Sequence, residues 1–431
     1  MQRSAEFAKY LPRFGWQPVV WSANRLDQLP YDETLTAELA DDLLRVTRPA
    51  CSYVARHRRI MRALEQLRLR RALGESRFQA IDWRVQGVLQ ALSSVTIPDD
   101  QLLWAIRSAG PLARLARRER IDAIYSTYSP VSNHLLGWWL QRVTRRPWIA
   151  DFRDLWTDDY CYPHHGRLRR WIDRRIEQTI LERADAVIGV TEGQTRVLAE
   201  HVPHRAGKFV CITNGVDAAM FERMDRDRVR SALHGPADQF VLAFAGWFLS
   251  DRVDPGFIAG MARFARLVKT EGGRFLFRVV GTISADQTRR FADMGVRTET
   301  TGYLAHNRAA EHMVAADVLL LFTPSGPNAH TVMTGKVFEY LGAARPILAV
   351  GPTDGIAPRL VRACHAGVCV ESGSAAVCAA LTDLWRGWQR GRLPAGCASE
   401  YIQPFRREHL TAKLADVLTS VQDARREKRG T

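Results

Sequence analysis

The chain has 431 residues, of which 46% are apolar, and a formal net charge of +15 that comes almost entirely from arginine. This length suits two domains of ordinary size, and the composition is that of a folded globular protein, which excludes wholesale disorder. The sequence contains neither a run of about eighteen apolar residues nor an apolar signal region, so we expect a cytoplasmic protein without a membrane span.

The excess of positive charge suits three kinds of partner: nucleic acid, an anionic membrane surface or a phosphorylated small molecule. The arginines form separate clusters, mostly in the first half of the chain, at residues 56–59, 68–71, 114–120, 167–175 and 425–429. Solvated helix faces would explain such clusters. The aromatic residues among them, Trp138, Trp139 and Trp171, favour attraction to a membrane surface as the alternative.

The first half of the chain alternates predicted helices and strands. Residues 3–12 have the apolar spacing of an amphipathic helix, and residues 18–22 form a short predicted strand. Residues 31–120 are the least regular part, with a helix predicted at 102–116. Buried strands are then predicted at 121–126, 148–152, 186–190 and 210–213. This alternation predicts a parallel sheet.

A second alternating series follows a charged segment at residues 223–234. Its strands are predicted at 240–245, 275–280, 318–322, 346–350 and 368–370, and a last helix is predicted at about 405–420, before a charged tail. The spacing predicts a second doubly wound sheet, so the fold class is α/β with two Rossmann-like lobes.

The segment from Thr334 to Pro352 has the most informative pattern. It predicts a short helix that begins at Gly335, and the unpaired amides of a helix N-terminus favour an anion. Lys336 lies in the first turn, and Glu339 lies three residues further on the same face. An ammonium suits phosphate and a carboxylate suits sugar hydroxyls, so the pattern favours a nucleotide sugar.

The run Gly-Lys-Val-Phe-Glu-Tyr-Leu at 335–341, followed by Arg-Pro-Ile-Leu at 345–348, resembles the donor-site helix of the family 4 retaining glycosyltransferases, of the bacterial surface-polysaccharide type. Three further segments resemble the same family in the expected order, at residues 147–156, 212–217 and 244–247. The resemblance implies the GT-B fold, in which two doubly wound lobes face each other across a cleft and the C-terminal helix returns to the first lobe.

The same resemblance implies a division of the chain. We expect an acceptor-side lobe at residues 1–215, a nucleotide-sugar-binding lobe at 236–400, and the return helix with a charged tail at 401–431. The family begins its first lobe with a strand and a glycine-rich loop. Neither has a counterpart before the helix at residues 3–12, so we expect the chain as given to be truncated. We expect residues 31–120 to be an insertion on the acceptor side.

A donor site is implied at the carboxyl ends of the second lobe's strands. Phosphate contacts are expected from Gly246, Arg252 and Lys336, and Glu339 is expected to accept hydrogen bonds from the ribose. The remaining donor-binding residues implied by the resemblance are Gly281, Thr282, Gly302, Tyr303, Leu304, Thr331 and Gly335. The alternatives are a surface arginine at 252 and a solvated carboxylate at 339.

Thr331 departs from the family pattern. The family often has a glutamate at this position, facing the transferred sugar or its phosphate. Threonine can donate a hydroxyl there but cannot supply a carboxylate, which puts the identity of the sugar in question.

Asp151, Arg153 and Asp154 follow a predicted strand of the first lobe. We expect them to bind and orient the acceptor, and together with Arg252, Lys336 and Glu339 they are the predicted catalytic residues. The alternative is a structural loop with an internal Arg–Asp pair. We expect His134 to be a packed or capping group on a helix.

We expect no metal and no cofactor. The candidate ligands are Cys364 and His365 with Cys369, the pair at 164–165, and Asp225 with Asp227, and all lack the spacing or setting of a metal site. In the resembled family, basic residues and helix dipoles neutralise the diphosphate.

The sequence therefore predicts transfer of a sugar, with retention, from a UDP- or GDP-sugar to a sugar or lipid-linked acceptor. The setting would be polysaccharide or glycolipid biosynthesis, with the protein peripheral at the inner face of the cell membrane. Two alternatives remain. A non-hydrolysing sugar-nucleotide epimerase would need acid–base groups near the sugar, and a basic nucleic-acid-binding protein would need a continuous basic groove with stacking aromatics.

Overall fold

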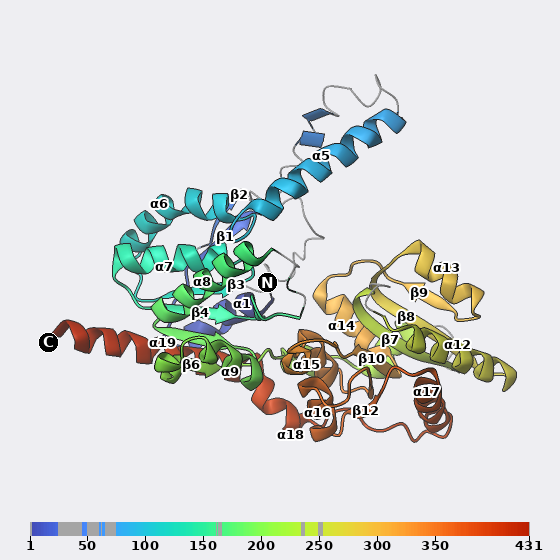
Figure 1. Ribbon diagram of the computed structural model, residues 1–431. Coiled ribbons are helices and arrows are strands. Elements are labelled where there is room, and N and C mark those ends of the chain that lie inside the picture. The colour runs from blue at the N-terminus through green and yellow to red at the C-terminus, as the bar shows by residue number, and fades with distance from the viewer. Residues whose placement is uncertain are drawn as a thin grey trace. The chain divides into compact units, whose positions relative to one another are not determined.

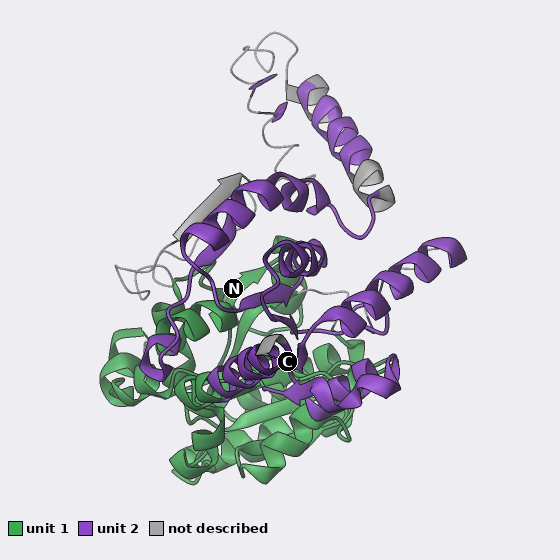
Figure 2. Ribbon diagram, turned by 90° about the vertical axis from the view of Figure 1, so that its left-hand side faces the viewer, with its two compact units in different colours: residues 1–10, 32–39, 213–412 green, residues 11–31, 40–212, 413–431 purple. Residues whose placement is uncertain are grey.

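The computed structural model describes residues 2–24, 45–49, 60–61, 63–64, 75–160, 162, 166–233, 238–248 and 253–430. The chain divides into two compact units that interleave along the sequence (Figure 2). Unit 1 comprises residues 1–10, 32–39 and 213–412, and unit 2 comprises residues 11–31, 40–212 and 413–431.

Unit 1 is built on a six-stranded parallel sheet. Its strands in chain order are β7 (Gln239–Phe248), β8 (Arg274–Ile283), β9 (Thr298–Thr300), β10 (Val318–Phe322), β11 (Ile347–Val350) and β12 (Gly367–Val370). Their spatial order is β12-β11-β10-β7-β8-β9, which is the doubly wound order of dinucleotide-binding folds. The five predicted strands of this lobe are confirmed. The sixth, β9, was missed because its sequence, Thr-Glu-Thr, is short and polar.

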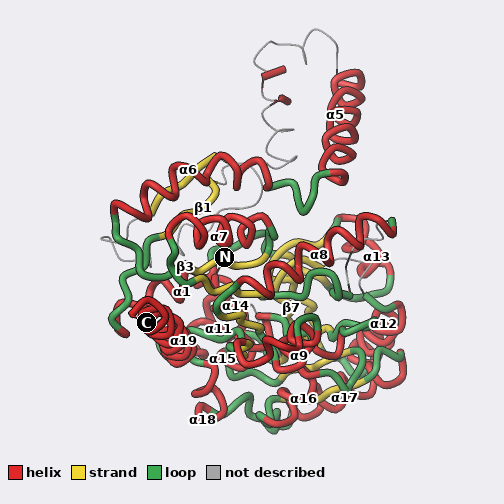
Figure 3. The backbone as a smooth tube through the Cα atoms, turned by 60° about the vertical axis from the view of Figure 1, so that its left-hand side comes forward, coloured by secondary structure: helices red, strands yellow, loops and turns green. Residues whose placement is uncertain are grey.

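Helices cover both faces of this sheet (Figure 1). One face carries α12 (Pro255–Thr270), α13 (Ala285–Asp293) and α17 (Ser374–Gln389), and the other carries α14 (His306–Ala315), α15 (Gly335–Gly342) and α16 (Ile356–Ala363). Helices α12 and α17 lie side by side (Figures 1 and 3). Side chains alternate across a strand, so residues of β7 contribute to the hydrophobic cores on both faces of the sheet. Phe240 and Leu242 pack on the face with α12 and α17, and Ala243 and Ala245 pack on the face with α14 to α16.

Helix α1 (Gln2–Tyr10) belongs to unit 1, although we expected residues 2–10 in the N-terminal lobe. Polar contacts that the sequence does not reveal explain the difference. Lys9 Nζ lies 3.0 Å from Asp217 Oδ2, and Arg3 Nη1 donates to the Thr213 carbonyl at 2.6 Å. The division at 1–215, 236–400 and 401–431 otherwise stays a prediction.

Three shorter helices complete unit 1: α10 (Ala218–Glu222), α11 (Arg226–Leu233) and α18 (Ser399–Ile402). Helix α11 accounts for most of the charged segment at 223–234. Asp225 caps it, since its Oδ1 accepts from the amides of Asp227 and Arg228 at 3.0 and 3.1 Å. The Asp225 and Asp227 pair thus lies at a helix start.

Unit 2 contains a four-stranded parallel sheet in the order β3-β4-β5-β6, and its strands confirm the four predicted in this lobe. They are β3 (Ile124–Tyr128), β4 (Trp148–Phe152), β5 (Ala186–Gly189) and β6 (Phe209–Cys211). A separate parallel pair joins β1 (Val20–Asn24) to β2 (Arg45–Pro49), and β2 lies in the stretch that we expected to be irregular. The helices are α5 (Glu75–Val95), α6 (Leu102–Arg118), α7 (Ser132–Thr144), α8 (Arg167–Arg183) and α9 (Glu192–Glu200).

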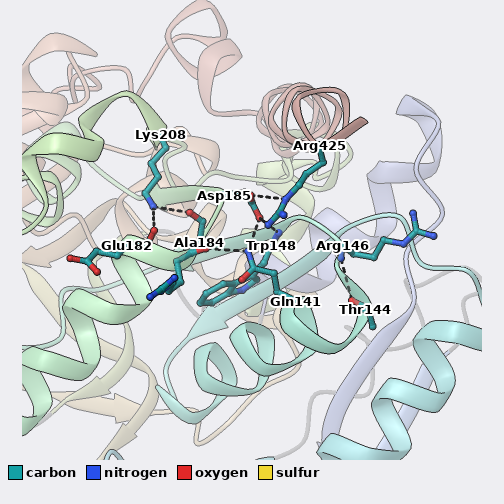
Figure 4. A network of polar contacts seen from close by, with 10 residues as sticks. Gln141, Thr144, Arg146, Trp148, Glu182, Ala184, Asp185, Lys208 and Arg425 are labelled. Carbon is teal, nitrogen blue, oxygen red and sulfur yellow. Dashed lines mark hydrogen bonds and ion pairs between the residues drawn. The ribbon is translucent and has the colours of Figure 1, made fainter. Parts of the chain in front are cut away.

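The last helix, α19 (Arg407–Gly430), begins in unit 1, and its residues from 413 onward belong to unit 2. Arg425 explains why: its Nε and Nη2 donate to the two carboxylate oxygens of Asp185 at 3.0 and 3.2 Å (Figure 4). Asp185 Oδ2 also accepts from the Trp148 amide at 2.9 Å and from Gln141 Nε2 at 2.7 Å. The predicted return of the last helix is confirmed. The helix is longer than predicted, because the charged residues 425–429 continue it.

Among the residues that the structure describes, no helix combines the length and the apolar composition needed to cross a lipid bilayer.

Candidate active site

The candidate site lies where strands β7 and β10 of unit 1 diverge. These two strands are neighbours in space but first and fourth in chain order, so helices leave them toward opposite faces of the sheet. Open parallel sheets bind their ligands at such a switch point, beyond the carboxyl ends of the strands. Helix α15 covers this point and presents Lys336 and Glu339 from adjacent turns.

Tyr340 fixes α15 against the end of β7. Its side chain is fully buried, and its hydroxyl oxygen accepts a hydrogen bond from the Ala245 amide at 2.9 Å. The registered pairing of β7 with β10 ends at Ala243, so this amide has no partner on that strand. A buried amide without a partner is costly, and the tyrosine therefore holds the helix in register with the sheet.

Lys336 is set against the backbone of β7. Gly246 has φ +119°, and a Cβ at this position would lie 2.8 Å from Lys336 Cε and 2.9 Å from Nζ. Only glycine leaves this space and adopts this conformation without strain. Lys336 Nζ also lies 4.3 Å from the centre of the Phe244 ring, which attracts the ammonium.

Lys336 has no hydrogen-bond acceptor and no ion-pair partner among the described residues. Burial lowers the pKa of its ammonium to about 8, and the nearby Glu339 carboxylate opposes that shift only in part. An ammonium that is partly desolvated and not fully compensated is suited to an anionic ligand.

Glu339 is held by two neighbours. Its Oε1 lies 2.8 Å from His306 Nε2 at the start of α14, and it accepts a hydrogen bond from Gln2 Nε2 at 2.9 Å. Burial alone would raise the pKa of Glu339. The hydrogen bonds from His306 and Gln2 and the charge of Arg407 outweigh burial, so the pKa lies below its usual value and the group is an ionised acceptor.

Gly281 stands beside Gly246 at the end of β8. Their residues are paired in the sheet, and a Cβ on Gly281, where φ is +143°, would lie 2.2 Å from the Gly246 carbonyl oxygen. The two glycines therefore allow the ends of β7 and β8 to approach closely. Thr282, which follows, is exposed.

The other predicted donor residues lie on loops of unit 1. Gly302 has φ +65°, Tyr303 is 48% exposed, and Leu304 packs against the core under α14 to α16. Thr331 is buried, and its hydroxyl donates to the Asn328 carbonyl at 2.7 Å. Gly335 is the first residue of α15, as predicted.

Beside Thr331, a cavity of about 210 Å³ opens between the loops that follow β10 and β11. His330 and Val332, which flank Thr331, line it together with Thr323 and Asp354. It lies at the same carboxyl edge of the sheet as Lys336. Arg252 lies outside the described residues, so its expected phosphate contact stays a prediction.

The predicted acceptor residues lie in unit 2. Asp151 is fully buried in β4 and accepts a hydrogen bond from the Tyr125 hydroxyl. Arg153 Nε donates to the Tyr128 carbonyl at 2.7 Å, and Asp154 is exposed. Arg153 thus fixes the loop after β3 through a backbone oxygen. Burial makes Asp151 a structural acceptor, which leaves Asp154 as the accessible carboxylate of the three.

His134 is a packed group on α7, as expected. It is fully buried, its Nδ1 lies 2.8 Å from Ser126 Oγ, and burial lowers the pKa of its ring to about 3. A neutral, buried histidine of this kind has a structural role in the core.

Among the described residues, one group of side chains brings three metal-ligating atoms within 4.8 Å: Asp158, Glu177 and His201 of unit 2. His201 Nε2 lies 2.6 Å from Asp158 and its Nδ1 lies 3.2 Å from Glu177, and the hydrogen bonds that the imidazole donates to these carboxylates raise the pKa of His201 to about 9. The imidazole is therefore protonated at neutral pH. Arg174 Nη2 also lies 3.7 Å from Asp158 Oδ2. The group is an ion-pair network.

The sequence did not single out His306, Gln2 or the Tyr340 hydroxyl. His306 follows the predicted donor-binding residues 302–304 and begins a helix. This position in the sequence is the one signal that could have identified it. The contacts of Gln2 and His306 with Glu339 span 337 and 33 positions, a separation that no local pattern encodes.

Comparison with known proteins agrees with this architecture. Residues 77–215 match the family model described as "Glycosyl transferase 4-like domain". No curated protein sequence gives a significant match to the chain.

Three solved structures share the fold over nearly the whole chain. A glycosyltransferase from Rickettsia africae is 12% identical, with a TM-score of 0.61 over 97% of this chain and 94% of that one. HepE from Anabaena, in complex with UDP and glucose, is 15% identical, with a TM-score of 0.60 over 97% and 95%. A putative UDP-N-acetylglucosamine 2-epimerase from Listeria monocytogenes is 11% identical, with a TM-score of 0.58 over 97% and 92%.

Residues 77–215 therefore match a glycosyl transferase 4-like domain, the α/β structure has two Rossmann-like lobes of the GT-B type, and the predicted resemblance to the family 4 glycosyltransferases is confirmed.

Proposed function

We propose that this protein transfers a sugar from a UDP- or GDP-sugar to an acceptor hydroxyl, with retention of configuration at the anomeric carbon. One observation carries the proposal. Lys336 is a partly desolvated ammonium without a partner among the described residues, held in the space left by Gly246 at the switch point of the sheet. HepE, which shares the fold, holds UDP and glucose.

The diphosphate would lie at the N-terminus of α15, against Lys336 and the first amides of the helix. Charge develops on this group as the bond to the sugar breaks, so a donor fixed in place lowers the barrier. Loss of one such donor costs about 2.7–4 kcal/mol in comparable sites. Glu339 would accept the ribose hydroxyls, since its carboxylate is ionised and held by His306.

The cavity beside Thr331 would receive the transferred sugar. It has room for a hydroxyl-bearing ring and lies at the same carboxyl edge of the sheet as Lys336. A carboxylate nucleophile at 331 is excluded by the sequence. We therefore favour attack on the same face, with the departing phosphate accepting the proton of the acceptor hydroxyl. Asp154 of unit 2 would bind the acceptor, and we expect no metal or cofactor.

The acceptor would be a sugar or a lipid-linked molecule of polysaccharide or glycolipid biosynthesis, at the cytoplasmic face of the membrane. Helix α8 supports this setting, because Leu168 and Trp171 are 72% and 58% exposed among its arginines. Such a surface suits anionic lipid. Sedimentation with vesicles tests it: binding to vesicles with anionic lipid, lost in Trp171→Ala, supports the setting, and equal binding by that variant contradicts it.

Calorimetric titration with nucleoside diphosphates and with inorganic pyrophosphate tests the donor site. UDP or GDP should bind, Lys336→Met should weaken both the nucleotide and pyrophosphate, and Glu339→Gln should weaken the nucleotide alone. Unchanged binding in Lys336→Met would refute the site. Single- or double-stranded nucleic acid that binds while nucleotides do not would favour the basic nucleic-acid-binding protein.

Product analysis separates the remaining alternatives. Incubation with a UDP- or GDP-sugar and an acceptor should release the free nucleoside diphosphate and leave the anomeric configuration of the product unchanged. A donor sugar inverted at one ring carbon, with the nucleotide still attached, would identify an epimerase.

A further inference from the structure

A second cavity, of about 300 Å³, opens in unit 1 at the opposite edge of the same sheet. Arg345 and Val314, which line it, lie two and four residues before strands β11 and β10, so the cavity lies toward the amino ends of these strands. The candidate donor site lies at their carboxyl ends. Lys336 of the donor site lies at the start of helix α15 and the second cavity lies at its end, beside Gly342, so the second cavity has no part in the function proposed above.

Three arginines line this second cavity: Arg226, Arg345 and Arg406. The Nε atom of each is buried without a hydrogen-bond partner. Buried donors in folded proteins are almost always paired, so three unpaired donors around one hollow are unusual. A ligand with several acceptor oxygens in the cavity would meet the guanidinium groups to which these buried Nε atoms belong.

The acidic residues near these arginines do not compensate all of them. Arg226 Nη2 lies 3.4 Å from Asp317 Oδ1, but Arg230 already holds that oxygen at 2.6 Å. Arg406 pairs with Glu222. Within the described part of the chain, Arg345 has neither an ion-pair nor a hydrogen-bond partner.

Arg345 carries the uncompensated charge. Burial, and after it the neighbouring charge of Arg226, lower the pKa of its guanidinium to about 10, against the weaker opposing effect of Asp317. Arg230 lowers the pKa further, and Asp227 opposes that shift. The group still remains charged at neutral pH. An anion placed beside it would offset both the repulsion between the arginines and the cost of burying the charge.

We propose that this cavity is a binding site for a phosphate monoester of a small polar molecule. The planar fork of arginine matches phosphate oxygens, and two or more such forks around one hollow are suited to a phosphate dianion. The rest of the wall includes the Ser399 hydroxyl and the apolar side chains of Phe221 and Ile402, which suits a polar ring attached to the phosphate. Glu222 also lines the cavity, paired with Arg406.

Titration calorimetry of the full chain tests the proposal with inorganic phosphate and a hexose 6-phosphate at constant ionic strength. Lys336→Met serves as the background, so that phosphate bound at the donor site does not contribute. In this background we expect one saturable site. Arg345→Gln should weaken it roughly tenfold or more, because hydrogen bonds to charged groups are lost.

Arg390→Gln is the matched control, since Arg390 is an exposed arginine of the same unit, and its affinity should equal that of the background. Arg345→Lys keeps the charge without the fork and should bind with intermediate affinity. A crystal grown with phosphate should show the anion between Arg345 and Arg406. Equal affinities in Arg345→Gln and Arg390→Gln, or no binding in the background itself, would overturn the proposal.

Discussion

His306 Nε2 lies 2.8 Å from Glu339 Oε1, which joins the first residue of α14 to the middle of α15. Both side chains are largely buried, with 14% and 17% of their surface exposed. This contact fixes the direction of the carboxylate before any ligand arrives. Preorganised acceptors of this kind lower the cost of binding, because less order is lost on association.

His306→Ala should weaken UDP binding by about fivefold, corresponding to roughly 1 kcal/mol for one hydrogen bond. Inorganic pyrophosphate should bind as before, since it does not reach the carboxylate. His409→Ala, at an exposed histidine of the same unit, should behave like the unchanged protein. Titration calorimetry of the three proteins checks this, and an equal loss for UDP and pyrophosphate would contradict the role given to His306.

Gly246→Ala should displace the Lys336 ammonium, because the new methyl group would lie within 3 Å of its last two atoms. The end of a lysine side chain is flexible, so the fold should survive, at a cost of roughly 1–2 kcal/mol for the strained backbone. We expect UDP affinity to fall roughly tenfold or more, since a charge-assisted contact is lost. Gly295→Ala has φ +78° and no atom within 4 Å of its new Cβ, so it should lose stability without losing affinity.

Tyr340→Phe should lower stability by about 1–3 kcal/mol, because the Ala245 amide would be left buried without an acceptor. The midpoint of thermal unfolding measures the loss. Tyr401→Phe is the control, since Tyr401 contacts the same core and its hydroxyl has no hydrogen-bond partner among the described residues. Similar losses in the two variants would contradict the role given to the Tyr340 hydroxyl.

Nucleotide affinity should depend on pH through Lys336. Burial lowers the pKa of its ammonium to about 8 in the free protein, and a bound diphosphate favours the charged form. Affinity should therefore be highest below pH 8, once the terminal phosphate is ionised above about pH 6, and should fall as pH rises through 8. Lys336→Arg carries a cation of much higher pKa, so its affinity should stay level between pH 7 and 9. A parallel decline in both proteins would place the titrating group elsewhere.

The sequence predicts the strands of both lobes well, because parallel strands buried on both faces are short, nearly continuous apolar runs such as Val318-Leu-Leu-Leu-Phe322. Lys336 and Glu339 were also within reach, since both lie in one helix whose start is marked by Gly335. The local sequence pattern therefore predicts the position of both residues. Such a pattern is sufficient where the residues of a site lie on one helix or strand.

The rest depends on contacts between distant segments. Residues 2–10 have the pattern of an ordinary amphipathic helix, and the ion pair of Lys9 with Asp217 attaches this helix to unit 1. Asp151 looks like an accessible loop carboxylate but ends in the core, because β4 extends through it and Tyr125 covers it. The second cavity is lined by Arg226, Arg345 and Arg406 from three separate segments of the chain, so no sequence motif predicts it.

The network around His201 should make the stability of unit 2 depend on pH. Hydrogen bonds donated to Asp158 and Glu177 raise the pKa of His201 from about 6.5 in the unfolded chain to about 9 in the folded protein. The folded protein binds the proton more tightly, so this contribution is fully present below pH 6.5 and is lost as pH rises through 9. His201→Gln should lower the melting temperature by about 2–4 °C per kcal/mol lost at pH 6, and by less at pH 9.5. His204→Gln, at an exposed histidine three residues away, should leave the melting temperature unchanged throughout. The charge of protonated His201 offsets the repulsion between the two carboxylates. If His201→Gln lowers the melting temperature as much at pH 9.5 as at pH 6, packing and not this charge stabilises the network.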